Sequence, residues 1–264
     1  MKISYSRTLA FYFFLLIAAL SVSSASAVVP PQYFYQLKIY HFTTTAQESR
    51  LNDYLQKAYV PALHAAGIKN VGVLKPIAGQ TVDSCIYVFI PFRTQDEMSS
   101  IDDRLNKNKE YLKAGSNYLD ADFKNAPYTR IETIILKAFT GMPAPEVPTI
   151  SAKKADRVYE LRSYESATEK YHVNKVRMFN EGDEIGLFKR LGFNAVFYSS
   201  VVAGSHMPNL MYMTAFNNRE DRDKHWKAFG NDPQWKTLSA RPEYQNNVSH
   251  IDILFLRPAD YSDF

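Results

Sequence analysis

A small set of side chains in this sequence has the chemistry and the placement to contact a ligand. Tyrosine hydroxyls and histidine rings can form hydrogen bonds, arginine can hold an anion, and tryptophan can line an apolar pocket. Arg222 and Trp226 are four positions apart, so they should share one face of a helix. The candidates are Tyr40, His41, Tyr87, Tyr164, His206, Tyr212, Arg222, Trp226 and Trp235.

The same side chains also have a structural interpretation, which the sequence leaves open. Aromatic residues at matching points of a duplicated fold can simply preserve the same packing, because a buried ring contributes a large apolar area. Arg222 could hold an anionic ligand or cap a helix C-terminus. Trp226 and Trp235 could line a pocket or anchor a helix. His206 lies in a predicted hairpin loop, where it could sit over the mouth of a pocket.

The sequence lacks the motifs of well-known catalytic and metal sites. Its six histidines show no metal-ligand spacing such as H-E-x-x-H, and it has neither a glycine-rich phosphate loop nor a G-x-S-x-G nucleophile. Cys85, the single cysteine, lies in an apolar strand and is expected to be a core residue rather than a reactive thiol. We therefore expect no metal and no cofactor, and the sequence identifies no catalytic residue.

The net charge and the first residues of the sequence indicate which partners and which cellular location to expect. The net charge of +4 is small and scattered along the chain, so nucleic acid is not an expected partner. Residues 1–27 combine Lys2 and Arg7, an apolar run and a final Ala25-Ser26-Ala27, which is the pattern of a secretory signal. The run has about 12 residues, whereas a membrane span needs about 20. We expect cleavage after Ala27, a periplasmic or secreted protein, and no membrane attachment after the signal is removed.

The rest of the sequence repeats itself. The segment Tyr35–Tyr40 returns as Tyr159–Tyr164, an offset of 159 − 35 = 124. From Gly67 onward the matches follow an offset of 192 − 67 = 125, which pairs Tyr87 with Tyr212. One residue is therefore gained within the intervening helix, and the repeat indicates duplication of a small domain.

Each predicted copy has the element order β-α-β-β-α-β with an extra helix, which is a ferredoxin-like arrangement. The third strand of each copy is apolar on both faces and must be covered on both sides. Because helices can cover only one side, we expect the two sheets to face each other within one chain, as an α+β pseudo-dimer. The predicted units are a first domain at 28–138, a proline-rich linker at 139–155 and a second domain at 156–264. The predicted strands are 34–42, 69–77, 84–92, 129–138, 157–164, 194–203, 210–216 and 251–257. The predicted helices are 47–66, 109–118, 171–190, 219–229 and 233–240. A further helix is expected to begin at the capping box 94–97.

The two copies resemble tandem NIPSNAP domains, one near Phe34–Leu136 and one near Arg157–Arg257, and the second copy fits better. The resemblance rests on Tyr-Glu-Leu-Arg-x-Tyr at 159–164, on Met213-Thr-Ala-Phe-x-x-Arg-x-x-Arg-x-x-x-Trp226, and on Asn231-Asp-Pro-x-Trp235. It implies a dimeric α+β barrel, a fold shared with small monooxygenases and haem-degrading enzymes, in an exported member of bacterial type. The family has no agreed catalytic activity. The first copy matches less well, since Tyr111 stands where Trp235 does, and it could be a degenerate scaffold.

Two hypotheses for function follow, and whether the protein is an enzyme stays open. The first is a module that binds a small apolar ligand or a protein partner, with homo-oligomer formation also open. It is motivated by a duplicated fold without a catalytic constellation. The alternative is a cofactor-independent, monooxygenase-like enzyme for a small apolar or aromatic substrate. That alternative rests on analogy of fold alone.

Overall fold

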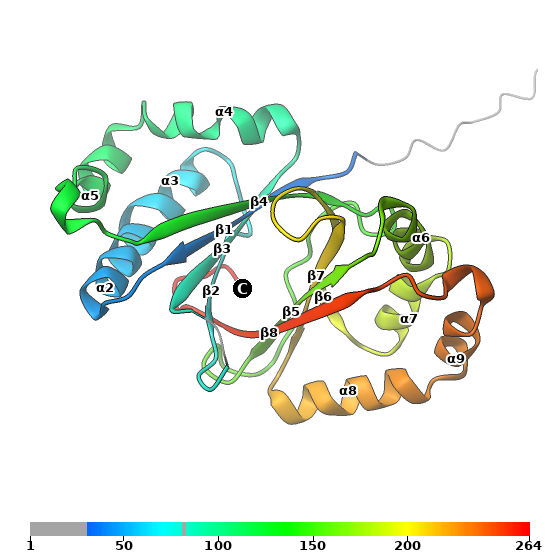
Figure 1. Ribbon diagram of the computed structural model, residues 1–264. Coiled ribbons are helices and arrows are strands. Elements are labelled where there is room, and N and C mark those ends of the chain that lie inside the picture. The colour runs from blue at the N-terminus through cyan, green and yellow to red at the C-terminus, as the bar shows by residue number, and fades with distance from the viewer. Residues whose placement is uncertain (1–30, 81–82) are drawn as a thin grey trace, which may run out of the picture. The chain divides into compact units, whose positions relative to one another are not determined.

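The computed structural model describes residues 31–80 and 83–264 (Figure 1). The expected signal segment, residues 1–27, lies outside these residues. Among the helices that the structure describes, none has the length and apolar character that a membrane span requires.

The described residues form a closed barrel of eight antiparallel strands (Figure 1). Around the barrel the order is β1-β3-β2-β8-β5-β7-β6-β4. Successive residues of each strand point alternately into the barrel and outward. The strands are β1 Phe34–His41, β2 Gly72–Pro76, β3 Cys85–Phe92, β4 Arg130–Ala138, β5 Val158–Glu165, β6 Asn194–Ala203, β7 Asn209–Phe216 and β8 His250–Pro258.

Each half of the chain contributes four neighbouring strands in the same order. This order is β4-β1-β3-β2 in the first half and β8-β5-β7-β6 in the second. The pairs β2–β8 and β4–β6 join the two sheets at both edges. The expected mixed α+β fold is confirmed, and the two sheets enclose a single barrel interior.

Helices cover the outside of the barrel, and those of each half pack on the strands of that half (Figure 1). The predicted capping box is confirmed at Thr94, whose Oγ1 accepts a hydrogen bond from the Glu97 amide at 3.1 Å. The helices are α2 Thr45–Tyr54, α3 Val60–Ala65, α4 Gln95–Leu105, α5 Lys109–Leu119, α6 Glu169–Asn180, α7 Glu184–Arg190, α8 Arg219–Asn231 and α9 Pro233–Ser239, with the π-helix η2 Leu55–Tyr59 between α2 and α3 and the short 3₁₀ turns η3 Phe123–Asn125 and η4 Pro242–Tyr244.

The barrel interior is apolar along most of its length. Phe89 and Phe197, one from each half, stack with their ring centroids 4.9 Å apart. Phe264 is only 1% exposed and packs against Tyr159 at the end where β5 begins. Burial of these rings between the two sheets stabilises the barrel, since each aromatic side chain removes roughly 150–250 Å² from water.

The predicted match between Tyr87 and Tyr212 is wrong by one residue. On β1 and β3, Lys38 pairs with Val88, whereas on β5 and β7 Arg162 pairs with Tyr212. The structural offset of the third strands is therefore 212 − 88 = 124, and not 125. Because side chains alternate between faces, one residue of slip places Tyr87 inside the barrel and Tyr212 outside it, under the helices.

The cause of the slip is the hairpin between the second and third strands. Gly79 and Gly204, which are 125 positions apart, both have positive φ angles of 90° and 157°. From Gly79 to the start of β3 at Cys85 there are six steps, whereas from Gly204 to the start of β7 at Asn209 there are five. The second hairpin is one residue shorter, which restores the offset of 124.

Candidate functional site

One end of the barrel has a cavity of about 340 Å³. Strands β1 and β5 run in the same direction around the antiparallel barrel, so both end at this mouth. The loop between β6 and β7, which carries His206, also lies there. Both halves of the chain line the cavity, so it exists only in the assembled barrel.

The cavity is lined by both apolar and polar side chains. On the first half Ile39 lies in register with Tyr87 on β3 and with Glu132 on β4. The apolar wall is made by Ile39, Ile134, Leu161, Met211 and Leu254. The polar lining comes from Tyr87, Glu132, Ser163, His206, Asn209 and Asp252. Such a surface suits a molecule with an apolar body and a polar end.

Asn209 is the polar residue of the mouth that is most deeply buried, with 3% exposure. Its Nδ2 donates to Ser163 Oγ at 2.9 Å. Its Oδ1 is buried and accepts no hydrogen bond from the residues that the structure describes. A buried acceptor without a donor costs roughly 1–3 kcal/mol, so a ligand that donates to this oxygen would gain affinity.

His206 lines the mouth and lies next to a neighbouring carboxylate. Its φ of 64° is in the left-handed region, which few residues other than glycine adopt. Its Nδ1 lies 2.8 Å from Glu165 Oε1. His206 is thus one of the residues that line the cavity.

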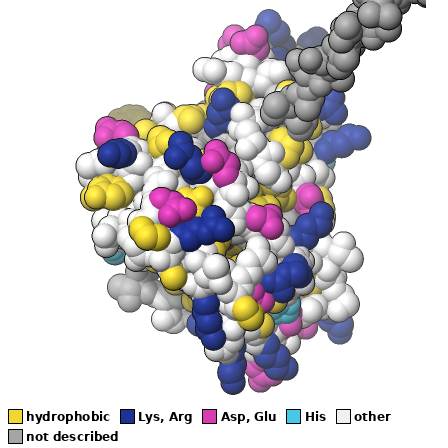
Figure 2. All heavy atoms as spheres, turned by 90° about the vertical axis from the view of Figure 1, so that its right-hand side faces the viewer, with side chains coloured by type: hydrophobic (Ala, Val, Ile, Leu, Met, Phe, Trp, Pro, Cys, Tyr) yellow, Lys and Arg dark blue, Asp and Glu magenta, His cyan; other side chains and the backbone are white. Residues whose placement is uncertain are grey.

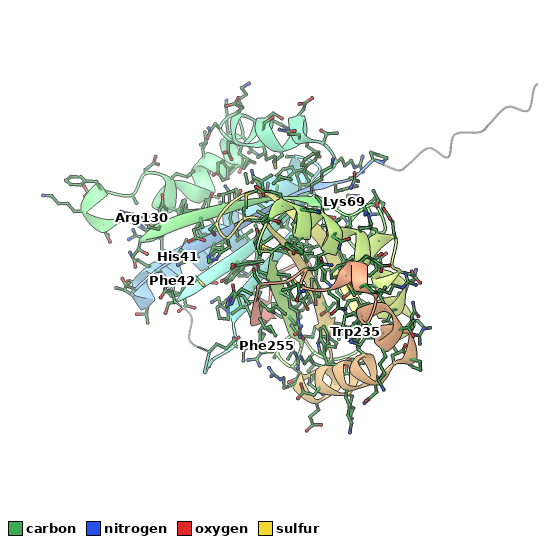
Figure 3. All side chains as sticks on the ribbon, turned by 45° about the vertical axis from the view of Figure 1, so that its right-hand side comes forward. His41, Phe42, Lys69, Arg130, Trp235 and Phe255 are labelled. Atoms are coloured by element: carbon green, nitrogen blue, oxygen red, sulfur yellow. The ribbon has the colours of Figure 1, made fainter. Side chains whose placement is uncertain are left out.

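Cys85 and His41 flank the mouth without lining the cavity. They are direct partners on β3 and β1. Burial raises the pKa of the Cys85 thiol to about 11, even though the Tyr87 hydroxyl acts in the opposite direction. The thiol is therefore protonated at neutral pH, in agreement with its expected role as a core residue. His41 Nε2 lies 3.8 Å from Glu132 Oε1, and Figure 3 shows His41 near Arg130 of β4.

A second polar group lies on the outer face of β5, beneath the helices of the second half. Glu160 is fully buried, and its carboxylate accepts hydrogen bonds from Arg162, Arg222 and Trp226. Arg222 reaches it with two nitrogens at 2.8 Å each, and the indole nitrogen of Trp226 is also at 2.8 Å. The guanidinium of Arg162 stacks 3.7 Å from the Trp226 ring centroid.

The network continues from Arg162 to the hydroxyl groups of two tyrosines. Arg162 Nη1 donates to the Tyr164 hydroxyl at 3.0 Å, which lies 2.7 Å from that of Tyr212. Burial raises the pKa of Tyr164's partner Tyr212 well above its ordinary value, so this phenol stays neutral. We call the set Glu160, Arg162, Tyr164, Tyr212, Arg222 and Trp226 the glutamate network.

The charges of the glutamate network compensate one another. Burial by itself raises the pKa of Glu160, but hydrogen bonds and charges from Arg222 and Arg162 outweigh it and hold this pKa below its ordinary value. The carboxylate is therefore ionised at neutral pH. A carboxylate held by two arginines and an indole has its acceptor sites filled, so this group is organised for structure.

Trp235 and Tyr40 have separate surroundings. Trp235 lies on α9 in the second half (Figure 3) and packs 4.5 Å from the Phe229 ring. Tyr40 is 2% exposed in the corresponding helical layer of the first half, edge-on to Tyr128. In that layer Tyr54 and Tyr111 share a hydrogen bond of 2.9 Å. A cluster of tyrosines thus replaces the glutamate network in the first half.

Six of the nine sequence candidates fall into two groups, whereas Tyr40, His41 and Trp235 lie apart from both. Tyr164, Tyr212, Arg222 and Trp226 come together in the glutamate network, while Tyr87 and His206 meet at the barrel mouth. Sequence reasoning missed Glu160 and Arg162, although the alternation of the motif at 159–164 places both on the face that helices cover. It also missed the polar residues of the mouth, namely Ser163, Asn209, Glu132 and Asp252.

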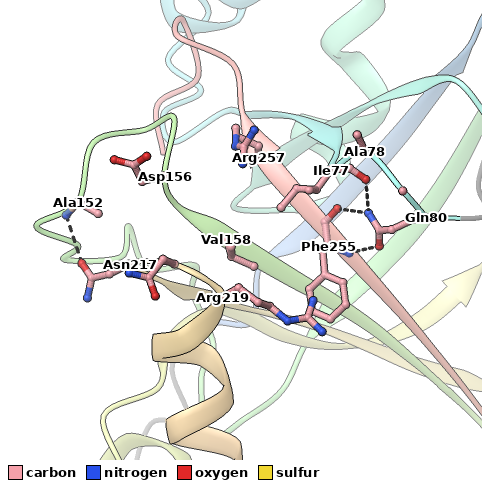
Figure 4. A pocket seen from close by; sticks show the side chains of 12 residues that line it. Ile77, Ala78, Gln80, Ala152, Asp156, Val158, Asn217, Arg219, Phe255 and Arg257 are labelled. Carbon is pink, nitrogen blue, oxygen red and sulfur yellow. Dashed lines mark hydrogen bonds between the residues drawn. The ribbon is translucent and has the colours of Figure 1, made fainter.

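A further groove lies outside the barrel at the seam between β2 and β8 (Figure 4). Gln80 donates to the backbone carbonyl of Phe255 at 2.7 Å and accepts from its amide at 2.8 Å. Arg219, at the start of α8, stacks on the Phe255 ring at 3.7 Å. These contacts explain how the hairpin between β2 and β3 is attached to the second half.

On the face drawn in Figure 2, basic and acidic side chains are intermixed.

Comparisons with known proteins found one matching family and several structures of similar fold. The NIPSNAP family profile matches residues 159–263. A search of curated protein sequences found no match. In structure the chain is similar to a candidate monooxygenase from Fusobacterium nucleatum subsp. nucleatum ATCC 25586, with a TM-score of 0.56 and 9% identity over 86% of this chain and 92% of that chain.

Two other solved structures share the fold. One is a candidate monooxygenase from Lactobacillus acidophilus NCFM, with a TM-score of 0.53, 13% identity, and coverage of 86% of this chain and 94% of that one. The other is an anthrone oxidase-like protein, with a TM-score of 0.51, 10% identity, and coverage of 88% and 93%. These likenesses concern the fold, whereas the profile match concerns the sequence. Residues 159–263 of this chain therefore form a NIPSNAP-family domain.

Proposed function

We propose that this protein binds a small amphipathic molecule in the mouth of its barrel. The observation that carries the proposal is the cavity of about 340 Å³, which has an apolar wall and a polar rim supplied by both halves. Its size is within the range of small-molecule sites. The proposal treats the chain as a fused pseudo-dimer, because both halves have the same strand order.

The rim favours a ligand with a donor or cationic end. Glu132 and Asp252 line the cavity, and each carries a carboxylate. Asn209, whose buried Oδ1 has no hydrogen-bond donor among the described residues, also lines the cavity. The apolar wall from Met211 and its neighbours would receive the hydrocarbon part of the ligand. A primary amine with an alkyl or aryl body has this combination, whereas a carboxylate would be repelled by the rim.

The proposal is tested with two probes of similar size and opposite charge. Phenethylamine and phenylacetate are titrated into the purified protein, with a chelator present, and binding is followed by ligand-observed NMR. We expect the amine to bind at least tenfold more tightly than the carboxylate. Equal binding of both probes, or binding of neither, would contradict the proposal.

A variant that fills the cavity locates the binding. Met211→Trp adds bulk to the apolar wall and should weaken phenethylamine binding at least tenfold. The control is Val173→Trp, since Val173 is 57% exposed on α6. Circular dichroism of both variants establishes that they fold. Undiminished binding by a folded Met211→Trp protein would place the amine elsewhere.

An enzymatic role at the same mouth is the second candidate. The solved structures of similar fold include two candidate monooxygenases and an anthrone oxidase-like protein. In this chain the cavity beside His206 and Tyr87 is where such a substrate would fit. Oxygen uptake by the purified protein with an aromatic substrate such as anthrone, and its loss in Met211→Trp, would support this role over simple binding.

A further inference from the structure

We propose that Glu165, His250 and Asp252 bind a divalent transition-metal ion at the rim of the barrel mouth. The site adjoins the proposed ligand cavity but does not require the organic ligand. One ligand atom from each of the three residues lies within 4.8 Å of the other two. The donor set is one imidazole nitrogen and two carboxylate oxygens.

Three paired strands hold these side chains on one face. Glu165 of β5 pairs directly with Asn209 of β7 on one side and with His250 of β8 on the other. Directly paired residues of antiparallel strands point to the same face of the sheet. Asp252 follows His250 by two positions and therefore shares that face. The side chains therefore converge from paired strands rather than from a loop, which favours precise ligand geometry.

Two oxygens in this row lack the donors that buried acceptors normally have. Asn209 is 3% exposed, and its Oδ1 has no hydrogen-bond partner among the described residues. Its neighbour Glu165 has a buried Oε1 in the same condition. His206 Nδ1 comes within 2.8 Å of that oxygen, but the approach does not have the geometry of a hydrogen bond. A cation beside Glu165 would satisfy acceptors that the protein itself leaves unsatisfied.

The spacing of the donor atoms also suits a shared ion. His250 Nε2 lies 3.0 Å from Asp252 Oδ1. This is a hydrogen-bond distance. When nitrogen and oxygen ligands lie about 2.0–2.2 Å from a tetrahedral metal ion, neighbouring ligand atoms are about 3.3–3.6 Å apart. The pair could therefore accept an ion with small side-chain adjustments.

The donor set indicates which ions would bind. Imidazole suits zinc, copper, iron and nickel, whereas magnesium prefers oxygen ligands alone. Zn²⁺ is therefore the appropriate probe, and Mg²⁺ is the discriminating one. Sequence reasoning did not predict this site, because Glu165 and His250 are 250 − 165 = 85 residues apart and meet only through strand pairing.

The proposal is tested by isothermal titration calorimetry of the chelator-treated full protein with Zn²⁺ and with Mg²⁺ at pH 7.5. We expect one Zn²⁺ per chain, with an affinity at least tenfold above that for Mg²⁺. His250→Ala and Asp252→Asn should each weaken Zn²⁺ binding at least tenfold. The matched control is His64→Ala, which removes a histidine that also lies beside a carboxylate, Asp263, at 2.9 Å.

Several results would overturn the metal site. These are Zn²⁺ affinities unchanged in folded His250→Ala and Asp252→Asn proteins, a loss of equal size in His64→Ala, or no saturable binding at all. The result is separable from that for the organic ligand, because phenethylamine is titrated with a chelator present. Zn²⁺ binding without amine binding would leave the metal site standing and remove the proposed function.

Discussion

Glu160 is the charge around which the helical layer of the second half is organised. Its carboxylate has no exposure to solvent and holds Arg162, Arg222 and Trp226 together. Two of these partners come from α8 and one from β5 itself, so the network fastens the helix to the sheet. Taking one partner away from a buried ion pair leaves an uncompensated charge, which is more costly than never having had the pair.

The Glu160→Gln variant should therefore be much less stable than the natural protein. At pH 7 we expect a loss of about 3–5 kcal/mol in the free energy of unfolding, because two guanidinium groups lose their buried counter-charge. Urea denaturation followed by circular dichroism measures the difference. Asp223→Asn is the control, since Asp223 contacts the exposed side of Arg222 and should have a far smaller effect.

The same comparison has a predicted pH dependence. The pKa of Glu160 is lowered in the folded state, so its contribution to stability is present above the ordinary glutamate pKa and is lost as the pH falls through the folded value. The difference between the natural protein and Glu160→Gln should therefore be constant from about pH 6 to 8 and shrink below about pH 4. A difference that grew toward acid pH would contradict a lowered pKa.

At the scale of elements, the register of the third strand decides what a tyrosine does. Tyr87 faces into the barrel and lines the mouth cavity. Tyr212 faces the helices, and its hydroxyl lies 2.7 Å from that of Tyr164. Sequence comparison pairs the two because the offset of 125 holds from Gly67 to Gly79. The shorter second hairpin then returns the offset to 124. A shift of one residue moves a side chain to the opposite face of the sheet.

Removal of each hydroxyl should separate the two roles. Tyr212→Phe should lose about 0.5–1.5 kcal/mol of stability, because a buried hydrogen bond is removed. Tyr87→Phe should keep its stability, while its affinity for phenethylamine changes. Thermal denaturation and NMR titration of both variants measure these effects, and similar behaviour of the two proteins would argue against the assigned register.

Much of the element pattern was predictable from the sequence alone. Strong aromatic and apolar alternation predicted the strands, and the capping box at Thr94 predicted the start of α4. The long helix predicted at 171–190 is instead two helices, α6 and α7, because Asp183 between them has a left-handed φ of 61°. The matching helix of the first half accommodates its chain through the π-helix η2. Hydrophobic periodicity does not distinguish a helix that is divided in two from one that contains a π-helical segment, since both keep the same face buried.

At the scale of the molecule, the barrel is closed at its other end by the last residues. Val73 donates its amide hydrogen to Ser262 Oγ at 3.0 Å, and Val71 donates to Asp263 at 2.7 Å. These bonds direct Phe264 into the interior, where a side-chain atom at Gly72 would clash with the ring at 2.5 Å. The absence of a side chain at Gly72 thus makes room for the aromatic plug.

The Phe264→Ala variant should be strongly destabilised. We expect a loss of about 3–5 kcal/mol in unfolding free energy, because the ring fills the apolar interior between the two sheets. The control is Phe123→Ala, since Phe123 is 85% exposed. Chemical denaturation of both variants checks the prediction, and equal stability of the two would show that the plug is not part of the core.

The sequence by itself determined the duplicated strand and helix pattern, the α+β class and the resemblance of residues 159–263 to a NIPSNAP domain. These follow from local periodicity and from motifs that are contiguous in the chain. Only the tertiary structure decided which side chains meet. The mouth cavity joins residues of both halves, and Glu165, Asn209 and His250 become neighbours through strand register. Register depends on turn length and on packing across the barrel, so the residue pattern of one strand does not contain it.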